Sequence, residues 1–233
     1  MVDSYSYYYS GYFLVIISFI VVTLAQVILR ITYARYKKKG TEKGLTGKEV
    51  AEKILHENGL DNVKVVEIQG ELTDNYYDAK KTVSLSTDIY NGESIAAASV
   101  AAHECGHAIQ YKVGYGPIKL RNKLVPIVNL GNTIGYIVMV IGLAASSLGL
   151  FWLGIILLSL ALVFQLVTLP CEFDASRRAN KILLEMELVS KKEQKGTKTM
   201  LRAAAFTYVA GLFSSIMQIL RLILIFSNRR GRR

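Results

Sequence analysis

The chain has 233 residues, of which 52% are hydrophobic, and a formal net charge of +10. Its Lys and Arg residues flank long uncharged runs instead of forming one patch interleaved with aromatic residues, which argues against nucleic-acid binding and favours anionic lipid headgroups as the counter-charge. The alternation of apolar and basic segments predicts a multi-pass protein of the cell membrane, mainly α, with three to four membrane helices and a small α+β domain.

The first apolar run, Tyr12–Leu29, carries no charge and approaches the ~20 residues that a spanning helix needs. It follows a short segment rich in Tyr and Ser, and it lacks the features of a cleaved signal peptide. Basic residues come directly after it, at Arg30, Arg35 and Lys37 to Lys39. Since positive charge favours the inner side of a membrane, we expect the segment that follows to be cytoplasmic.

The next segment is polar and predicts a small α+β unit. Thr46 and Glu49 form a capping-box pattern that opens a helix, and Asn58-Gly59 ends it. Two strands are expected, at Val63–Ile68 and Thr82–Ser86, with a turn region at Thr73–Ala79 between them. Ser94 is the expected N-cap of the helix that follows.

Residues 124–171 contain no Asp, Glu, Lys, Arg or His. That length predicts a hairpin of two membrane spans, Ile127–Ala145 and Leu148–Leu169. We expect Glu172 to open a separate helix and 191–198 to be a polar linker, while Ala203–Phe226, interrupted by Arg221, is expected to associate with the membrane without fully crossing it. The chain thus divides into 1–29 (tail and first span), 30–123 (catalytic domain), 124–170 (hairpin), 171–202 (third-ligand helix and linker) and 203–233 (apolar helix and basic tail).

The chemistry is concentrated in His103-Glu104-Cys105-Gly106-His107, the pattern H-E-x-x-H. Helical spacing places the two histidines one turn apart on one face, where both imidazoles can bind a single zinc ion. Glu104 lies beside that face and is expected to act as the general base toward a zinc-activated water. Gly106 would let another element approach closely.

A catalytic zinc takes three protein ligands and keeps one position open. Glu172 is the expected third ligand, because the two-span hairpin returns it to the level of the motif helix; His56 is read instead as a solvated residue at a helix end. Asp174 or Ser176 is a candidate to hydrogen-bond a ligand imidazole, and Arg177 or Tyr208 is a candidate donor to the oxyanion. A peptide substrate is expected along the strand edge formed by Thr82, Val83, Ser84, Leu85 and Ser86.

The motif, the hairpin after it and the sequence Leu169-Pro170-Cys171-Glu172-Phe173-Asp174-Ala175-Ser176 together resemble the YugP-type neutral zinc metallopeptidases of bacterial membranes. Leu72-Thr73-Asp74, Val83-Ser84-Leu85-Ser86 and Thr207-Tyr208-Val209-Ala210 extend the resemblance over nearly the whole chain. The order of segments is also similar to the heat-shock and prenyl-protein membrane peptidases, in which a carboxylate matching Glu172 completes the zinc site. Those relatives carry an aspartate where this chain has Ser176. The resemblance implies one zinc ion per chain and a polypeptide substrate.

Two alternatives stay open: a non-catalytic membrane scaffold that binds zinc, and a protease with its motif buried inside a membrane span. The second is disfavoured because Ser94–Ala102 is too short for a span and neither hairpin span carries an acid. Cys105 and Cys171, the only two cysteines, exclude a disulfide framework. They are interpreted as small buried hydrophobes, with a redox contact behind the zinc as the alternative.

Overall fold

The computed structural model describes residues 2–230 and divides the chain into two units. One comprises Met1–Gln26, Leu120–Leu169 and Thr207–Arg233, and its described residues are built from helices. The other comprises Val27–Lys119 and Pro170–Phe206 and holds every strand of the described chain. We call them the helical unit and the globular unit.

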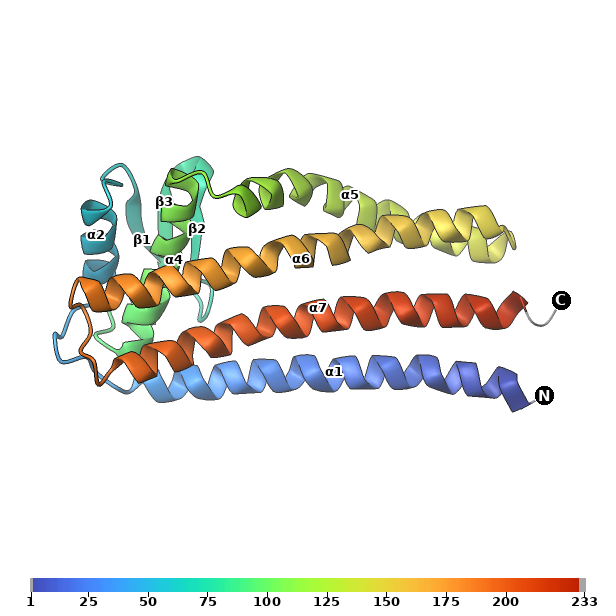
Figure 1. The fold of residues 1–233 in the computed structure, drawn as a ribbon, viewed down its shortest axis with the longest axis horizontal. Coiled ribbons are helices and arrows are strands. Elements are labelled where there is room, and N and C mark those ends of the chain that lie inside the picture. Colours follow the sequence, from blue (N-terminus) through green and yellow to red (C-terminus); the bar gives the residue numbers. More distant parts are fainter. Residues whose placement is uncertain (1, 231–233) are drawn as a thin grey trace. The chain divides into compact units, whose positions relative to one another are not determined.

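The helical unit is formed by parts of four long helices: α1 (Val2–Lys37), α5 (Gly116–Ala144), α6 (Leu148–Glu185) and α7 (Gln194–Arg230). In Figure 1 the α5–α6 hairpin is joined by a tight connection, in agreement with the turn predicted at Ser146-Ser147. All four helices are long and apolar enough to cross a membrane. Large apolar side chains such as Phe19, Leu130 and Ile156 are exposed on them, as expected for surfaces that face lipid.

Two boundaries differ from the sequence prediction. Glu172 does not open a helix: α6 continues through Pro170 to Glu185, because the change to polar composition there does not interrupt the helical backbone. α7 begins at Gln194, inside the predicted linker. Its segment Gln194–Leu224 is long and apolar enough to cross a membrane, like the other three spans, and the partial insertion expected from Arg221 stays a prediction.

The globular unit contains a three-stranded sheet with the order β1-β3-β2. β1 (Lys64–Ile68) is parallel to β3 (Thr82–Ser86), and β2 (Asn75–Tyr77) is antiparallel to it. β2 and the 3-10 turn Asp78–Lys80 replace the turn region predicted at 73–79, because pairing with β3 orders a segment too short to show alternation. The predicted strands at β1 and β3 are confirmed.

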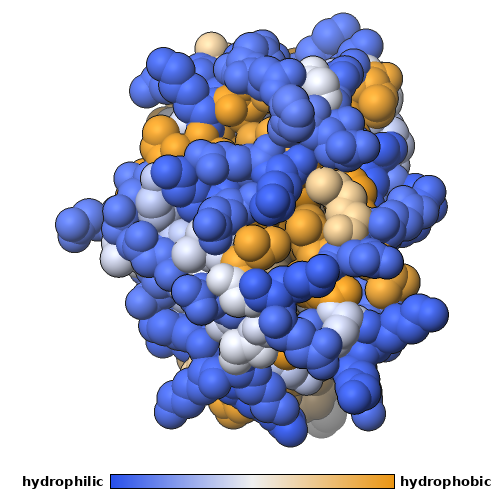
Figure 2. Space-filling model, turned by 90° about the vertical axis from the view of Figure 1, so that its left-hand side faces the viewer, coloured by the Kyte–Doolittle hydropathy of each residue, from blue (hydrophilic) through white to orange (hydrophobic). Residues whose placement is uncertain are grey.

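Three helices complete this unit: α2 (Gly47–Glu57), the short α3 (Thr87–Tyr90) and α4 (Ile95–Lys112). The capping box of Thr46 and Glu49 opens α2 as predicted, and Ser94 caps α4. α4 carries small residues, among them Ala97, Ala101 and Ala108, all fully or almost fully buried in a core shared with α2 and β3. Figure 2 shows that hydrophilic side chains cover most of the outer face of this unit.

Candidate metal centre

The H-E-x-x-H motif lies in the middle of α4, and α6 packs directly against it. A Cβ atom added to Gly106 would lie 2.8 Å from the carbonyl oxygen of Ala175, so only glycine permits this approach of the α6 backbone. The close approach predicted at Gly106 is therefore present. It sets Glu172, one turn before Ala175, against the two histidines.

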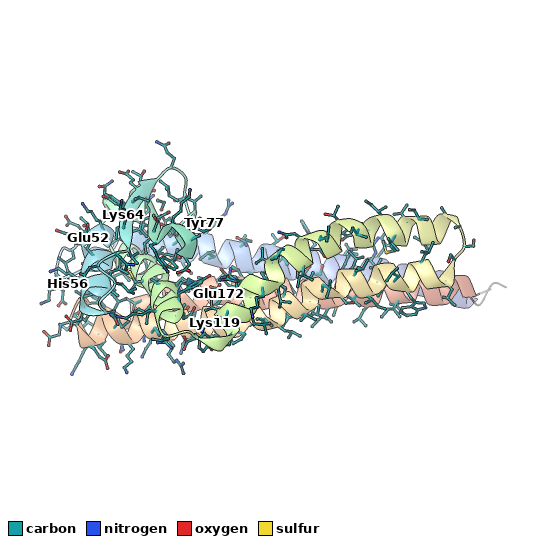
Figure 3. All side chains as sticks on the ribbon, turned by 90° about the horizontal axis from the view of Figure 1, so that it is seen from above. Glu52, His56, Lys64, Tyr77, Lys119 and Glu172 are labelled. Atoms are coloured by element: carbon teal, nitrogen blue, oxygen red, sulfur yellow. The ribbon has the colours of Figure 1, made fainter. Side chains whose placement is uncertain are left out.

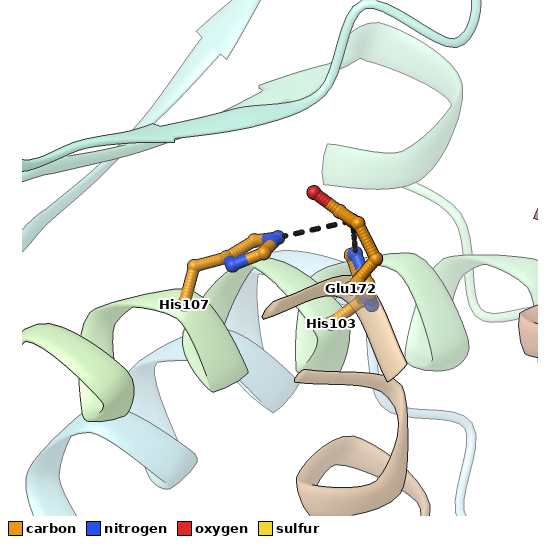
Figure 4. Close-up of side chains that lie close together, drawn as sticks. All are labelled: His103, His107 and Glu172. Atoms are coloured by element: carbon orange, nitrogen blue, oxygen red, sulfur yellow. Dashed lines mark ion pairs between the residues drawn. The ribbon is translucent and has the colours of Figure 1, made fainter. Parts of the chain in front are cut away.

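His103, His107 and Glu172 meet in one buried cluster (Figure 4). Oε2 of Glu172 lies 3.3 Å from Nε2 of His103 and 3.5 Å from Nε2 of His107. One ligand atom from each residue lies within 4.8 Å of the others. The side chain of Glu172 is only 2% exposed, while those of the histidines are 14% and 10% exposed.

The donor set fits a zinc ion. Oε2 of Glu172 is buried and has no hydrogen-bond partner among the described residues, which is costly for a carboxylate unless a cation satisfies it. Two imidazoles and one carboxylate are also the ligand types of catalytic zinc sites that keep a position open. These three residues would hold the ion.

Each histidine is oriented through its other ring nitrogen. Nδ1 of His103 lies 3.2 Å from Oγ of Ser176 on α6, so this predicted supporting contact is present. Nδ1 of His107 lies 3.1 Å from Oε1 of Gln110, one turn further along α4. These contacts leave both Nε2 atoms directed at Glu172, the arrangement that a metal-binding imidazole requires.

Asp174 acts through Gln110 and not directly on an imidazole. The amide nitrogen of Gln110 donates to Oδ2 of Asp174 at 3.0 Å and to the carbonyl of Cys171 at 2.7 Å. Arg177 and Arg178 form ion pairs with the same carboxylate. Arg177 is thus engaged by Asp174, which leaves its predicted role as an oxyanion donor without support.

Sequence reasoning missed Gln110. It is fully buried, and its place at i+3 from His107, on the same helix face, is the sequence signal that could have identified it.

Asp74 is a second residue that the sequence prediction did not single out. Its carboxylate accepts hydrogen bonds from the backbone nitrogen and the hydroxyl of Ser86, at 2.7 and 3.0 Å, and burial raises the pKa of this group.

Glu104 is 7% exposed and makes no hydrogen bond within the part of the chain that the structure describes. Burial raises the pKa of Glu104 above its ordinary value; charged imidazoles at His103 and His107 act in the opposite direction, and the carboxylate of Glu172 adds to the rise. A carboxylate with a raised pKa is better suited to accept and return a proton near neutral pH.

The remaining predicted residues lie elsewhere. β3 is the central strand, and its residues Thr82–Ser84 pair with β1 on one side and β2 on the other, so this part of the predicted substrate edge is closed and the prediction is wrong there. Tyr208 belongs to the helical unit. His56 lies on the outer side of α2, well away from Glu172 (Figure 3), and is solvent-exposed as predicted.

Cys105 and Cys171 are fully buried and form no disulfide bond. The thiol of Cys105 is directed at the carbonyl of Ala51 in α2, 3.6 Å away, so it faces away from the ligand atoms. Both positions agree with the prediction of small buried hydrophobes.

Comparison with known proteins agrees with this site. The family model described as "Putative neutral zinc metallopeptidase" matches residues 11–227. The chain is 42% identical over 206 residues to the "Putative membrane protease YugP" of Bacillus subtilis (strain 168), covering 88% of this chain and 92% of that protein. No solved structure matches the chain. The chain therefore belongs to the neutral zinc metallopeptidase family that this model describes.

Proposed function

We propose that this membrane protein is a zinc-dependent endopeptidase that cleaves polypeptides at the cytoplasmic surface of the cell membrane, with Glu104 as general base. One observation carries the proposal: the buried Oε2 of Glu172, which makes no hydrogen bond to the described residues, lies 3.3 Å from Nε2 of His103 and 3.5 Å from Nε2 of His107. A zinc ion bound there would lower the pKa of a water molecule and polarise the scissile carbonyl.

The chain's own residues supply the proton chemistry. Glu104 neighbours both ligand histidines on α4 and has no competing hydrogen bond among the described residues, so its carboxylate is available to take a proton from the attacking water. The same carboxylic acid would then return the proton to the leaving amine. The buried surroundings of Glu104 strengthen these electrostatic interactions because little water competes with them.

β2 replaces β3 as the proposed substrate edge. Within the described chain β2 pairs with β3 on one side only, and it contacts α4, the helix of the metal ligands. An extended peptide that added to β2 would present its backbone to the site. We expect a model peptide with N-methylated backbone nitrogens to show a higher KM than its unmethylated form; an equal KM for methylation at each position would contradict β-addition.

The decisive experiment measures zinc and hydrolysis together. Native protein, Glu172→Ala and Glu104→Gln are purified in detergent, and zinc content and casein cleavage are determined for each. We expect native protein to bind one zinc ion and cleave casein, Glu172→Ala to lose zinc, and Glu104→Gln to keep zinc without activity. Full activity in Glu104→Gln would refute the mechanism, and native zinc affinity in Glu172→Ala would refute the ligand assignment. An inactive native protein with one zinc ion would favour the scaffold.

The cytoplasmic location rests on charge. Basic residues flank the spans on the side of the globular unit, at Lys37 to Lys39 and at Lys119, Arg121 and Lys123. If α7 crosses fully, a tag after Arg233 is exposed on the opposite side of sealed vesicles from a tag at Lys43. Protease digestion of both tags from the same side would contradict that crossing.

A further inference from the structure

The helical unit contains a partly open cavity of about 230 Å³ between α5, α6 and α7. Its lining is unusually polar for a membrane-spanning bundle, where most side chains are aliphatic. Asn132 and Tyr136 line it from one face of α5, while Ser214, Ser215 and Gln218 line it from α7. Leu158 and Ala161 of α6 and Ile219 of α7 complete the wall.

Three of these polar groups lack partners among the described side chains. Neither the amides of Asn132 and Gln218 nor the hydroxyl of Tyr136 makes a hydrogen bond within residues 11–224, whose side chains the structure describes. The two serines are engaged: Ser215 donates to the carbonyl of Gly211 at 3.1 Å, and Ser214 contacts Ser18 at 3.5 Å. Polar side chains that hold membrane helices together form hydrogen bonds with one another. These three groups do not, so they are available to bind a ligand.

The cavity lies at the middle of its helices. Within the helical unit Asn132 stands twelve residues from Leu120 and twelve from Ala144, where α5 ends. Gln218 stands eleven residues from Thr207 and twelve from Arg230, where α7 ends. At 1.5 Å per residue each is roughly 18 Å from either end, which is near the centre of a bilayer whose hydrocarbon core is about 30 Å thick.

That depth and the lining decide the class of ligand. A phospholipid headgroup belongs at the membrane surface, and the cavity offers no Lys or Arg to a phosphate. A membrane-spanning polypeptide helix, in contrast, carries amide or hydroxyl side chains to mid-bilayer. Such residues are costly in lipid and are normally buried against a partner helix, so they are exposed when a membrane protein is misfolded or unassembled.

We infer that this cavity binds a polar side chain at the centre of a substrate's membrane-spanning helix, through Asn132, Tyr136 and Gln218. The inference rests on the proposed peptidase function and specifies its substrate class: membrane proteins that expose an Asn, Gln, Ser or Thr residue to lipid. It assigns the helical unit a role in selection that is separate from the zinc ligands.

The test measures binding without cleavage. Full-length protein with Glu104→Gln is placed in nanodiscs, and fluorescent 20-residue helical peptides, polyleucine with either Asn or Leu at the centre, are titrated by energy transfer. We expect the Asn peptide to bind roughly 3- to 30-fold more tightly, the range of interhelical polar bonds in membranes. Adding Asn132→Leu with Gln218→Leu should bring the ratio to about one. Thr133→Val, an adjacent α5 residue outside the lining, should leave the ratio unchanged.

Retained zinc binding by the double variant shows that its globular unit is folded, and an unchanged helix content by circular dichroism shows that its helical unit is folded. If either is lost, Tyr136→Phe, which removes one hydroxyl, must lower the ratio instead. Equal binding of the two peptides, or a ratio that the lining variants do not alter, would overturn the inference. A dimer that becomes monomeric in the double variant would also overturn it, because a second copy would then fill the cavity. Loss of casein cleavage by the native protein tests the peptidase function and leaves this ratio unaffected.

Discussion

Oε1 of Gln110 lies 3.1 Å from Nδ1 of His107, and the amide nitrogen of the same side chain is held by two acceptors on α6. Asp174 and the carbonyl of Cys171 can only accept hydrogen bonds, so they must face the NH2 group of the Gln110 amide. The amide oxygen of Gln110 therefore faces His107. The imidazole therefore carries its proton on Nδ1 and presents a lone pair at Nε2 toward Glu172. Gln110 is a positioning residue for the metal centre.

Replacing Gln110 with Leu should weaken zinc binding. The substitution keeps the volume of the side chain but leaves His107 without its orienting acceptor, so we expect a loss of affinity of about 10- to 100-fold. Chelator competition measures the affinity, and the ¹⁵N shifts of His107 report its tautomer. Ser99→Ala is the matched control, since Ser99 is buried on the same helix and its hydroxyl donates, among the described residues, only to the carbonyl of Ile95. Native affinity and an unchanged tautomer in Gln110→Leu would contradict the positioning role.

Gly106→Ala should separate α4 from α6. The new methyl group would meet the Ala175 carbonyl at 2.8 Å, and the backbone there cannot yield without displacing Glu172. We expect destabilisation of about 1–3 kcal/mol, as for other overpacked sites, together with weaker zinc binding. Gly116→Ala is the control, because nothing lies within 4 Å of a Cβ at that position. Thermal unfolding midpoints and zinc titration compare the two variants, and equal behaviour would exclude a steric role for Gly106.

The sequence predicts best what is determined locally. The capping box of Thr46 and Glu49 and the one-turn spacing of His103 and His107 need only the helical backbone, and both are present. The β2 strand and the function of Gln110 depend instead on partners distant along the chain: β2 is ordered by β3, and Gln110 by α6. Glu172 was predicted because the two-span hairpin returns it to the level of the motif helix, although the uninterrupted course of α6 through Pro170 was not predicted.

Asp74 should make stability depend on pH. Burial raises the pKa of Asp74 in the folded chain, so the folded state binds this proton more tightly than the unfolded state does. Its contribution to stability is therefore present below the unfolded pKa of about 3.9 and is lost as pH rises through the folded pKa. Asp74→Asn, which carries no charge, should gain stability relative to Asp74 as pH rises from 4 to 7.

The unfolding midpoints of the chain with Asp74 and of Asp74→Asn are both measured with a chelator present and with Glu104→Gln in the background. This isolates the ionisation of Asp74 from zinc and from the carboxylate of Glu104. The hydrogen bonds from Ser86 can still be accepted by the asparagine oxygen, so the comparison tests charge and not loss of a partner. A stability difference that is constant with pH, or that shifts toward Asp74 at neutral pH, would show that the burial of this group does not control its ionisation.

Both cysteines should resist alkylation until the chain unfolds. Cys105 and Cys171 are fully buried, and burial, with the nearby Glu104 carboxylate, raises the pKa of the Cys105 thiol, so little of the reactive thiolate forms. Mass spectrometry after iodoacetamide treatment should find neither labelled in native protein and both labelled in denaturant. Thr199→Cys, at an exposed position of the globular unit, should label rapidly in the native state. If Cys105 in the native protein were labelled as rapidly as Thr199→Cys, its thiol would be accessible. That result would favour the alternative in which oxidation of this cysteine affects the zinc site.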